Sequence, residues 1–189
     1  MSDQIRSDVA RLLGARIRAL RTGLELSVVK LAERSGVSRR MLTQVELGQA
    51  NPSVSTVDKI AGALGTSFAA LVGVQDRPAP DGVEIWSTEE GSWAYLVNAV
   101  ETPEATIELW TWHLVRGDRY RTGSAPGAPA SMVHVTAGEV RVLAGGAETR
   151  IGERRSARID ADEERSFDAV TPVADFVWVV TIPRDAGPA

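Results

Sequence analysis

The sequence predicts an α + β protein of two domains, the first built from helices and the second from β-strands. Apolar residues recur at helical spacing up to about residue 72, whereas apolar and polar residues alternate at strand spacing after residue 106. Residues 1–76 carry ten basic and seven acidic side chains, a net charge of +3. Residues 77–189 carry eleven basic and eighteen acidic side chains, a net charge of −7, and all five tryptophans. We therefore expect domains at 8–74 and 83–184, joined by a linker at 75–82 that contains two prolines and a glycine.

The composition excludes several classes of protein. The 189 residues include 43% hydrophobic and 24% charged residues, which is typical of a globular protein with a substantial core. There is no cysteine, so disulfides, thiolate metal sites and cysteine nucleophiles are excluded. No stretch reaches the roughly 18 uncharged apolar residues of a membrane span, and the first residues do not read as a secretion signal. We expect a cytoplasmic protein with no membrane partner.

Five short helices are expected in the first domain, because each apolar face is preceded by a capping residue or followed by a glycine. In order, they run from Asp8 to Gly23, from Ser27 to about Arg34, from Arg39 to about Leu47, from Ser53 to Leu64, and briefly after Ser67. Between the second and third helices stand Gly36, one apolar residue (Val37) and a new capping residue (Ser38). Two helices joined by such a tight turn predict a helix-turn-helix bundle.

Four landmarks occur in order in this part of the chain. They are Leu13-Gly14-Ala15-Arg16-Ile17-Arg18-Ala19-Leu20-Arg21, Leu31-Ala32-Glu33-Arg34-Ser35-Gly36-Val37-Ser38, Val45-Glu46-Leu47-Gly48 and Asn51-Pro52-Ser53. Over about residues 10–72 this pattern resembles the XRE-type (phage-repressor-like) family of helix-turn-helix transcriptional regulators. The resemblance implies a double-stranded operator DNA as partner, bound by a homodimer.

The exposed half of the third helix carries side chains suited to reading bases. Arginine binds guanine O6 and N7 in a bidentate manner, and glutamine pairs with adenine N6 and N7. The resemblance implies that Arg39, Arg40 and Gln44 reach base edges, that Thr43 lies close by, and that the remaining candidates face phosphates. The DNA-binding candidates are Ser27, Ser38, Arg39, Arg40, Thr43, Gln44 and Asn51. The alternative is that the two arginines form only a solvated face.

Four other residues of this domain are not expected to contact DNA. Val28 stands where the family often has a phosphate-binding glutamine, and Leu47 replaces a common polar residue, so fewer backbone contacts are expected. The resemblance also implies that Arg21 and Glu46 form a structural ion pair, with Arg21 holding the start of the loop after the third helix.

The second domain is expected to be a β-barrel or β-sandwich. Strand-like alternation occurs in segments 107–115, 132–136, 139–143 and 175–180, with glycine or proline breaks between them. The segment Val133-His134-Val135-Thr136-Ala137-Gly138-Glu139-Val140 resembles the strand–turn motif of cupins. A cupin-like β-barrel is therefore expected over about residues 83–184, as a sensor domain.

The residues at the metal positions of this resemblance are of the wrong type. Metal-binding cupins have a glutamate where Ser131 stands, and histidines at places that fall to Ser124, Pro126 and Arg165. We therefore expect no metal, no cofactor and no catalytic residue. The two histidines of the chain are not expected to rebuild a site, because His134 should face away from the interior, while His113 could face either way. The ligand-binding candidates are Trp110, Trp112, Ser131 and Arg165, with core packing as the alternative role of the two tryptophans.

Three hypotheses follow. The first is a sequence-specific, non-enzymatic transcriptional regulator whose metal-free barrel senses a small-molecule effector. The second is a cupin enzyme, a metal-dependent oxygenase or isomerase, with a DNA-binding regulatory head. The third is a DNA-binding protein whose barrel serves only to dimerise it.

Overall fold

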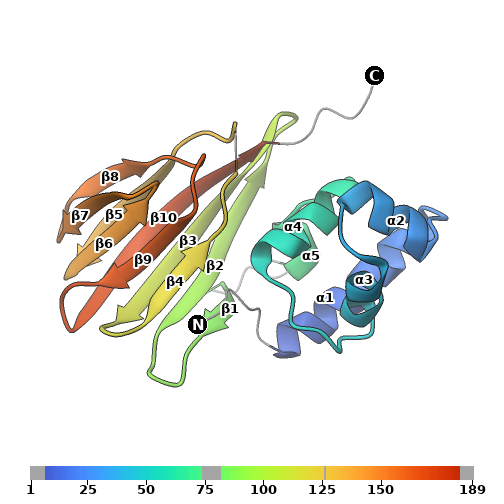
Figure 1. Cartoon of the computed structure of the whole chain (residues 1–189), viewed down its shortest axis with the longest axis horizontal. Coiled ribbons are helices and arrows are strands. Elements are labelled where there is room, and N and C mark those ends of the chain that lie inside the picture. The colour runs from blue at the N-terminus through green and yellow to red at the C-terminus, as the bar shows by residue number, and fades with distance from the viewer. Residues whose placement is uncertain (1–6, 74–81, 126, 184–189) are drawn as a thin grey trace. The chain divides into compact units, whose positions relative to one another are not determined.

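The computed structural model describes residues 7–73, 82–125 and 127–183 (Figure 1). Its helices and strands fall into two compact units, one holding all the helices and the other all the strands. The predicted linker at 75–82 lies outside the described residues except for Gly82, and residues 74 and 184 at the predicted domain ends lie outside them too. The domain boundaries therefore stay a prediction.

The helical unit contains the five predicted helices. They are α1 (Ser7–Gly23), α2 (Val28–Ser35), α3 (Arg39–Glu46), α4 (Val54–Ala63) and α5 (Phe68–Val72). Each of the last four begins after a serine whose hydroxyl oxygen accepts a hydrogen bond from the backbone N–H three residues further on. These serines are Ser27, Ser38, Ser53 and Ser67. Local capping chemistry therefore sets the helix starts that the sequence predicts.

Helix α1 packs closely against α3. The contact depends on Gly14, because a Cβ atom at this position would lie 2.2 Å from the backbone oxygen of Val45. Around this contact the unit buries apolar residues from all five helices, among them Leu13, Ile17, Leu31, Leu42, Val57, Ile60 and Phe68. The packing of its buried face against α1 and the core thus fixes the position of α3.

The strand unit consists of ten strands in two antiparallel sheets. The strands are β1 (Val83–Ser87), β2 (Trp93–Glu101), β3 (Ala105–Val115), β4 (Arg119–Thr122), β5 (Ser131–Ala137), β6 (Glu139–Ala144), β7 (Ala147–Gly152), β8 (Ser156–Ile159), β9 (Arg165–Ala169) and β10 (Val173–Pro183). One sheet has the order β1-β2-β3-β10-β5-β8 and the other the order β4-β9-β6-β7. The four expected strands are β3, β5, β6 and β10, and the other six were not expected.

The two sheets pack face to face around aromatic side chains. Trp112 of β3 contacts Tyr120 of β4, and Phe176 of β10 contacts Phe167 of β9. Two antiparallel sheets packed in this way form a jelly roll, which is the cupin-like fold that the sequence predicts. Among the described strands the sheets are not joined edge to edge, so the domain is a two-sheet sandwich of cupin type.

The glycine of the cupin-like motif has a structural explanation. Gly138 lies between β5 and β6 with a φ of +75°, and a Cβ atom there would lie 2.4 Å from the backbone oxygen of Val173. Only glycine fits this turn without displacing β10.

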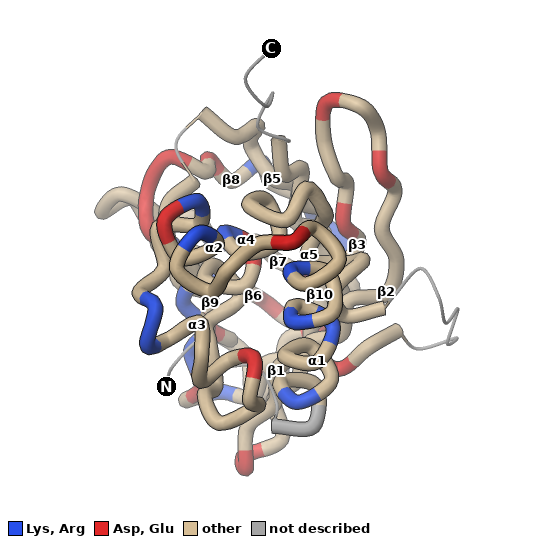
Figure 2. Tube along the Cα trace, turned by 90° about the vertical axis from the view of Figure 1, so that its right-hand side faces the viewer, with Lys and Arg blue, Asp and Glu red and all other residues tan. Residues whose placement is uncertain are grey.

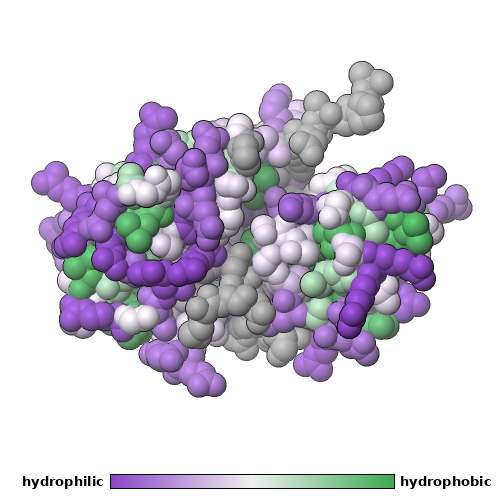
Figure 3. Space-filling model, in the orientation of Figure 1, coloured by the Kyte–Doolittle hydropathy of each residue, from purple (hydrophilic) through white to green (hydrophobic). Residues whose placement is uncertain are grey.

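The surface of both units is mainly hydrophilic, in contrast to their apolar cores. In the view of Figure 3, hydrophilic residues cover most of both units, and hydrophobic residues form small separate patches. No helix in the described part of the chain is long and apolar enough to cross a membrane.

Candidate functional sites

The turn between α2 and α3 is held by backbone geometry and one buried serine. Gly36 adopts a left-handed conformation with a φ of +65°, which ends α2. The hydroxyl of Ser35 donates a hydrogen bond to the backbone oxygen of Leu31 (2.8 Å) and accepts one from the N–H of Val37 (3.3 Å). Because Val37 is itself buried, the chain enters α3 at a fixed position.

Helix α3 buries one face and exposes the other. Leu42 and Val45 are buried in the core, whereas Arg39, Arg40 and Thr43 are exposed. Thr43 uses its hydroxyl to donate to the backbone oxygen of Arg39 (2.9 Å). Neither Arg39 nor Arg40 forms an ion pair or a side-chain hydrogen bond within the described residues, so both guanidinium groups are available to a partner.

Arg21 and Glu46 form the ion pair that the resemblance implies. Arg21 Nε donates to Glu46 Oε1 (2.6 Å) and Arg21 Nη2 to Glu46 Oε2 (2.9 Å). The side chains are 11% and 6% exposed, and hydrogen bonding to Glu46 raises the pKa of Arg21 above its ordinary value. Glu46 is the last residue of α3, so the pair holds Arg21 against the end of this helix, where the following loop begins. Arg21 Nη1 also donates to the backbone oxygen of Leu26 (2.8 Å), so Arg21 joins the end of α3 to the loop before α2.

The remaining candidates of this unit lie at helix starts and in a loop. The hydroxyl oxygen of Ser27 accepts from the N–H of Lys30 (3.1 Å) and that of Ser38 from the N–H of Met41 (3.2 Å), so each keeps its hydroxyl proton for another acceptor. Asn51 is exposed just before α4, and Gln44 is half-buried. Figure 2 shows basic segments along α1, α2 and α3. That these side chains touch DNA stays a prediction.

Val28 and Leu47 are the two apolar residues that stand where related regulators often have polar side chains. Val28 is half-buried at the start of α2, and Leu47 is 54% exposed at the end of α3. Neither side chain can donate a hydrogen bond to a phosphate, so this surface offers fewer backbone contacts than a polar pair would.

The interior of the strand unit is filled by aromatic rings. Trp112 lies at the centre, with ring centroids 4.4 Å from Tyr120, 5.8 Å from Phe176 and 6.1 Å from Trp178. Trp110 lies 6.2 Å from Trp112. The two tryptophans that the sequence singled out are therefore part of a buried aromatic cluster, and the contribution of Tyr120 and Trp178 to it was missed.

Two further ligand candidates lie in the same interior. Ser131 is buried, and its hydroxyl donates to the backbone oxygen of Ile159 (3.2 Å). Arg165 is also buried, with Nη1 and Nη2 donating to the backbone oxygens of Asp160 and Gly123 (3.1 Å each). Burial lowers the pKa of Arg165 below its ordinary value.

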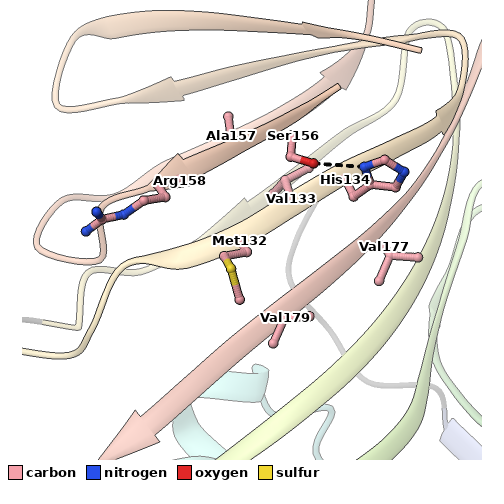
Figure 4. Close-up of a pocket in the computed structure, with 8 residues that line it drawn as sticks. All are labelled: Met132, Val133, His134, Ser156, Ala157, Arg158, Val177 and Val179. Carbon is pink, nitrogen blue, oxygen red and sulfur yellow. Dashed lines mark hydrogen bonds between the residues drawn. The ribbon is translucent and has the colours of Figure 1, made fainter. Parts of the chain in front are cut away.

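The two histidines lie on the outer face of the six-stranded sheet. His134 is exposed, as its register predicts, and its Nδ1 is 2.8 Å from Ser156 Oγ. The ring of His113 stacks on Trp93 with a centroid distance of 5.5 Å, and its Nδ1 is 2.6 Å from Asp175 Oδ1. An open groove of about 350 Å³ lies beside His134. Figure 4 shows the side chains that line it. It is lined by Met132, Val133, His134, Ser156, Ala157, Arg158, Val177 and Val179.

Comparison with known proteins identifies the helical unit. The helix-turn-helix family model HTH_3 matches residues 17–71. The uncharacterized HTH-type transcriptional regulator y4dJ of Sinorhizobium fredii is 36% identical over 70 residues, a match that covers 37% of this chain and 91% of that protein. The chain belongs to the HTH_3 helix-turn-helix family.

Two further curated relatives match stretches of similar length. The immunity repressor protein of Bacillus phage phi105 is 40% identical over 78 residues, covering 41% of this chain and 54% of the repressor. The Escherichia coli regulator SutR is 34% identical over 73 residues, covering 39% of this chain and 41% of SutR. The chain thus matches about half the length of these curated relatives. A solved HTH_3 family transcriptional regulator from Vibrio cholerae has a TM-score of 0.72 at 22% identity, covers 94% of this chain and 99% of its own, and shows the same fold.

The interior of the strand unit does not fit the metal site of metal-binding cupins. Of the four ligand positions, Ser131 and Arg165 occupy two, exposed Ser124 a third, and Pro126 lies outside the described residues. A guanidinium has no lone pair for a metal ion. Within the ranges that the structure describes, no three His, Asp or Glu side chains gather closely enough to hold one.

A charged cluster on the four-stranded sheet was missed by the sequence reasoning. Asp168 of β9 accepts hydrogen bonds from Arg119 Nη2 (3.2 Å) and Arg141 Nε (3.1 Å), with Arg141 Nη2 also on the same oxygen. Burial alone would raise the pKa of Asp168, but the hydrogen bonds from Arg141 and Arg119 hold it below its ordinary value. These residues lie on three strands and are 27 and 49 positions apart from Asp168, so no local pattern connects them.

Proposed function

We propose that the protein is a sequence-specific transcriptional regulator that binds operator DNA through α3. The observation that carries the proposal is that α3 has one buried face and one exposed face. The exposed face carries Arg39 and Arg40, and neither forms an ion pair within the described residues. Arg39 and Arg40 at the start of α3, with Gln44 about one turn further along, suit the major groove, where bases present distinct acceptor patterns. Family membership supports the same function.

The DNA-binding form is proposed to be a homodimer. A single small unit with a net charge of +3 for residues 1–76 makes few phosphate contacts, so its binding to DNA would be weak. Each mismatched base pair in the site would weaken that binding further. Two copies present two α3 helices to successive major grooves, about 34–36 Å apart along the duplex. The operator is then expected to contain two half-sites.

The strand unit is proposed to sense a small-molecule effector without a metal. Its support is the buried interior, where Ser131 and Arg165 replace the ligands of metal-binding cupins. An effector that prefers one arrangement of the dimer would shift the population toward it and change DNA affinity reciprocally. We propose no enzymatic activity. The Ser156 hydroxyl lies 2.8 Å from His134 Nδ1, but this pair is on the exposed outer face of the six-stranded sheet, and no acidic side chain among the described residues hydrogen-bonds to His134 to orient it.

The experiment is selection of fragmented genomic DNA and random duplexes by the purified full chain. The proposal expects enrichment of one motif with two half-sites about one helical turn apart. Recovery of no preferred sequence would contradict it. The alternative in which the strand unit serves only dimerisation is supported instead if no compound in a thermal-shift screen stabilises that unit. The enzyme alternative is supported if the purified protein carries stoichiometric metal and loses an activity with a chelator.

A further inference from the structure

The exposed large apolar side chains of the strand unit gather on one surface, the outer face of the six-stranded sheet. Strand β3 buries every second residue from Thr106 to Leu114 and turns the residues between them outward, and β5 and most of β10 alternate in the same way. The large apolar residues that are 37–59% exposed among the described residues of this unit are Val100, Ile107, Leu109, Met132 and Val173, and all stand at outward positions of this sheet. We call this surface the apolar face. Apolar side chains gathered on one face mark an interaction site, whereas single scattered ones do not.

The two outer faces of the strand unit differ in charge. On the four-stranded sheet, Arg119 and Arg141 both stand opposite Asp168 in the strand register. On the apolar face, the described outward positions of β2, β3, β10 and β5 hold no lysine or arginine, and their one carboxylate, that of Asp175, is paired with His113. Residues 77–189 carry a net charge of −7, so two copies repel each other over most of this unit but not over the apolar face.

The two halves of the apolar face complement each other in shape. The groove of about 350 Å³ lies on the half formed by β10, β5 and β8, where Val177, Val179 and Met132 line it (Figure 4). The exposed side chains of Val100 and Leu109 lie on the other half, on β2 and β3. A two-fold axis that runs along the strands between β3 and β10 lays each half against the opposite half of a second copy. The projecting side chains of one copy then meet the groove of the other.

Charge and area also favour a second copy as the occupant. The edge strands of the sheet carry opposite charges, with Glu84 on β1 and the exposed Arg158 on β8. The same two-fold axis brings the β8 edge of one copy to the β1 edge of the other. The six strands have 4 to 11 residues each, so at ~4.8 Å between strands and ~3.4 Å per residue they present a face of about 700 Å². A stable interface of standard size buries about 800 Å² per partner, which this face nearly matches.

We propose that the apolar face is the dimer interface of this protein, packed against the same face of a second copy about a two-fold axis between β3 and β10. An interface of this symmetry must be self-complementary, and the groove and the projecting side chains meet that requirement. The interface lies within the strand unit and uses no residue of α3. The inference names the surface through which the proposed homodimer forms, and so rests on the proposed function.

The test measures self-association of the full chain without DNA. Sedimentation equilibrium over a range of protein concentrations gives the dimer Kd, and the wild type is expected to approach twice the chain mass of 20.2 kDa. Leu109→Glu places a carboxylate near the centre of the interface and should raise the dimer Kd at least tenfold. Met132→Glu, at a position that is 55% exposed, should do the same. Tryptophan fluorescence checks that the strand unit is folded, and Met132→Glu alone decides the test if Leu109→Glu is not.

Leu24→Glu is the matched control, because Leu24 is an equally exposed leucine of the helical unit, and it should associate as the wild type does. The inference is overturned if the wild type sediments as a monomer at every concentration, if the folded face variants dimerise as tightly as the wild type, or if Leu24→Glu weakens the dimer as much as they do. Such a result leaves the selection of a DNA motif through α3 untouched. A dimer that depends on the apolar face but selects no DNA sequence contradicts the proposed DNA-binding function alone.

Discussion

Replacing Glu46 by glutamine should destabilise the helical unit while leaving the strand unit unchanged. The substitution keeps the shape of the side chain but leaves the Arg21 charge without its carboxylate. Both side chains are nearly buried, at 11% and 6% exposed, so solvent screens the pair only weakly. Removing one partner of a buried pair costs roughly 3–5 kcal/mol, and Arg21 retains its hydrogen bond to Leu26, so we expect about 3 kcal/mol.

The two units can be followed separately in one urea titration. Far-UV circular dichroism at the helical band reports the helical unit, and tryptophan fluorescence reports the strand unit, which holds all five tryptophans. Glu33→Gln, at an exposed position of α2, is the matched control and should change the free energy of unfolding by less than about 0.5 kcal/mol. The double variant Arg21→Met with Glu46→Leu should recover most of the loss, because no charge is then left unpaired. A Glu46→Gln protein as stable as the Glu33→Gln control would refute the reasoning.

Two further changes have expected outcomes. Gly14→Ala places a Cβ atom 2.2 Å from the backbone oxygen of Val45 and should lower the free energy of unfolding of the helical unit by about 2 kcal/mol or more. Gly62→Ala in α4, where a Cβ atom meets nothing within 4 Å, should stabilise the same unit slightly. Equal melting curves for the two variants would contradict this. Asp168 has a lowered pKa in the folded protein, so its contribution to stability is present above its ordinary pKa of about 4 and is lost as the pH falls through the folded value. Asp168→Asn should therefore destabilise the strand unit at pH 7 and flatten its loss of stability in acid, as measured by tryptophan fluorescence in urea; an unchanged acid dependence would count against the ion-pair cluster.

The parts of the fold that the sequence predicts depend on neighbouring residues. Ser27 and Ser38 cap their helices through N–H groups three positions away, and β5 shows its alternation within seven residues. Strand β9 is buried at all five positions and strand β7 at only one, so neither shows an alternating pattern. The same limit applies to the sites. The exposed face of α3 follows from its helical period, while the partners of Asp168 and the burial of Arg165 depend on strands brought together by the tertiary fold.

The most direct test of the central claim compares specific and non-specific DNA binding by Arg39→Ala, Arg40→Ala and Lys59→Ala. Fluorescence anisotropy would give the affinity of each full-length variant for the selected operator and for a scrambled duplex at one fixed salt concentration. Lys59→Ala removes one positive charge from an exposed position of α4 and controls for net charge. Reading of bases by α3 predicts that each arginine variant loses about 5- to 150-fold in operator affinity and far less on the scrambled duplex, with Lys59→Ala keeping its discrimination. Wild-type operator affinity in both arginine variants, with their helices intact, would contradict the account.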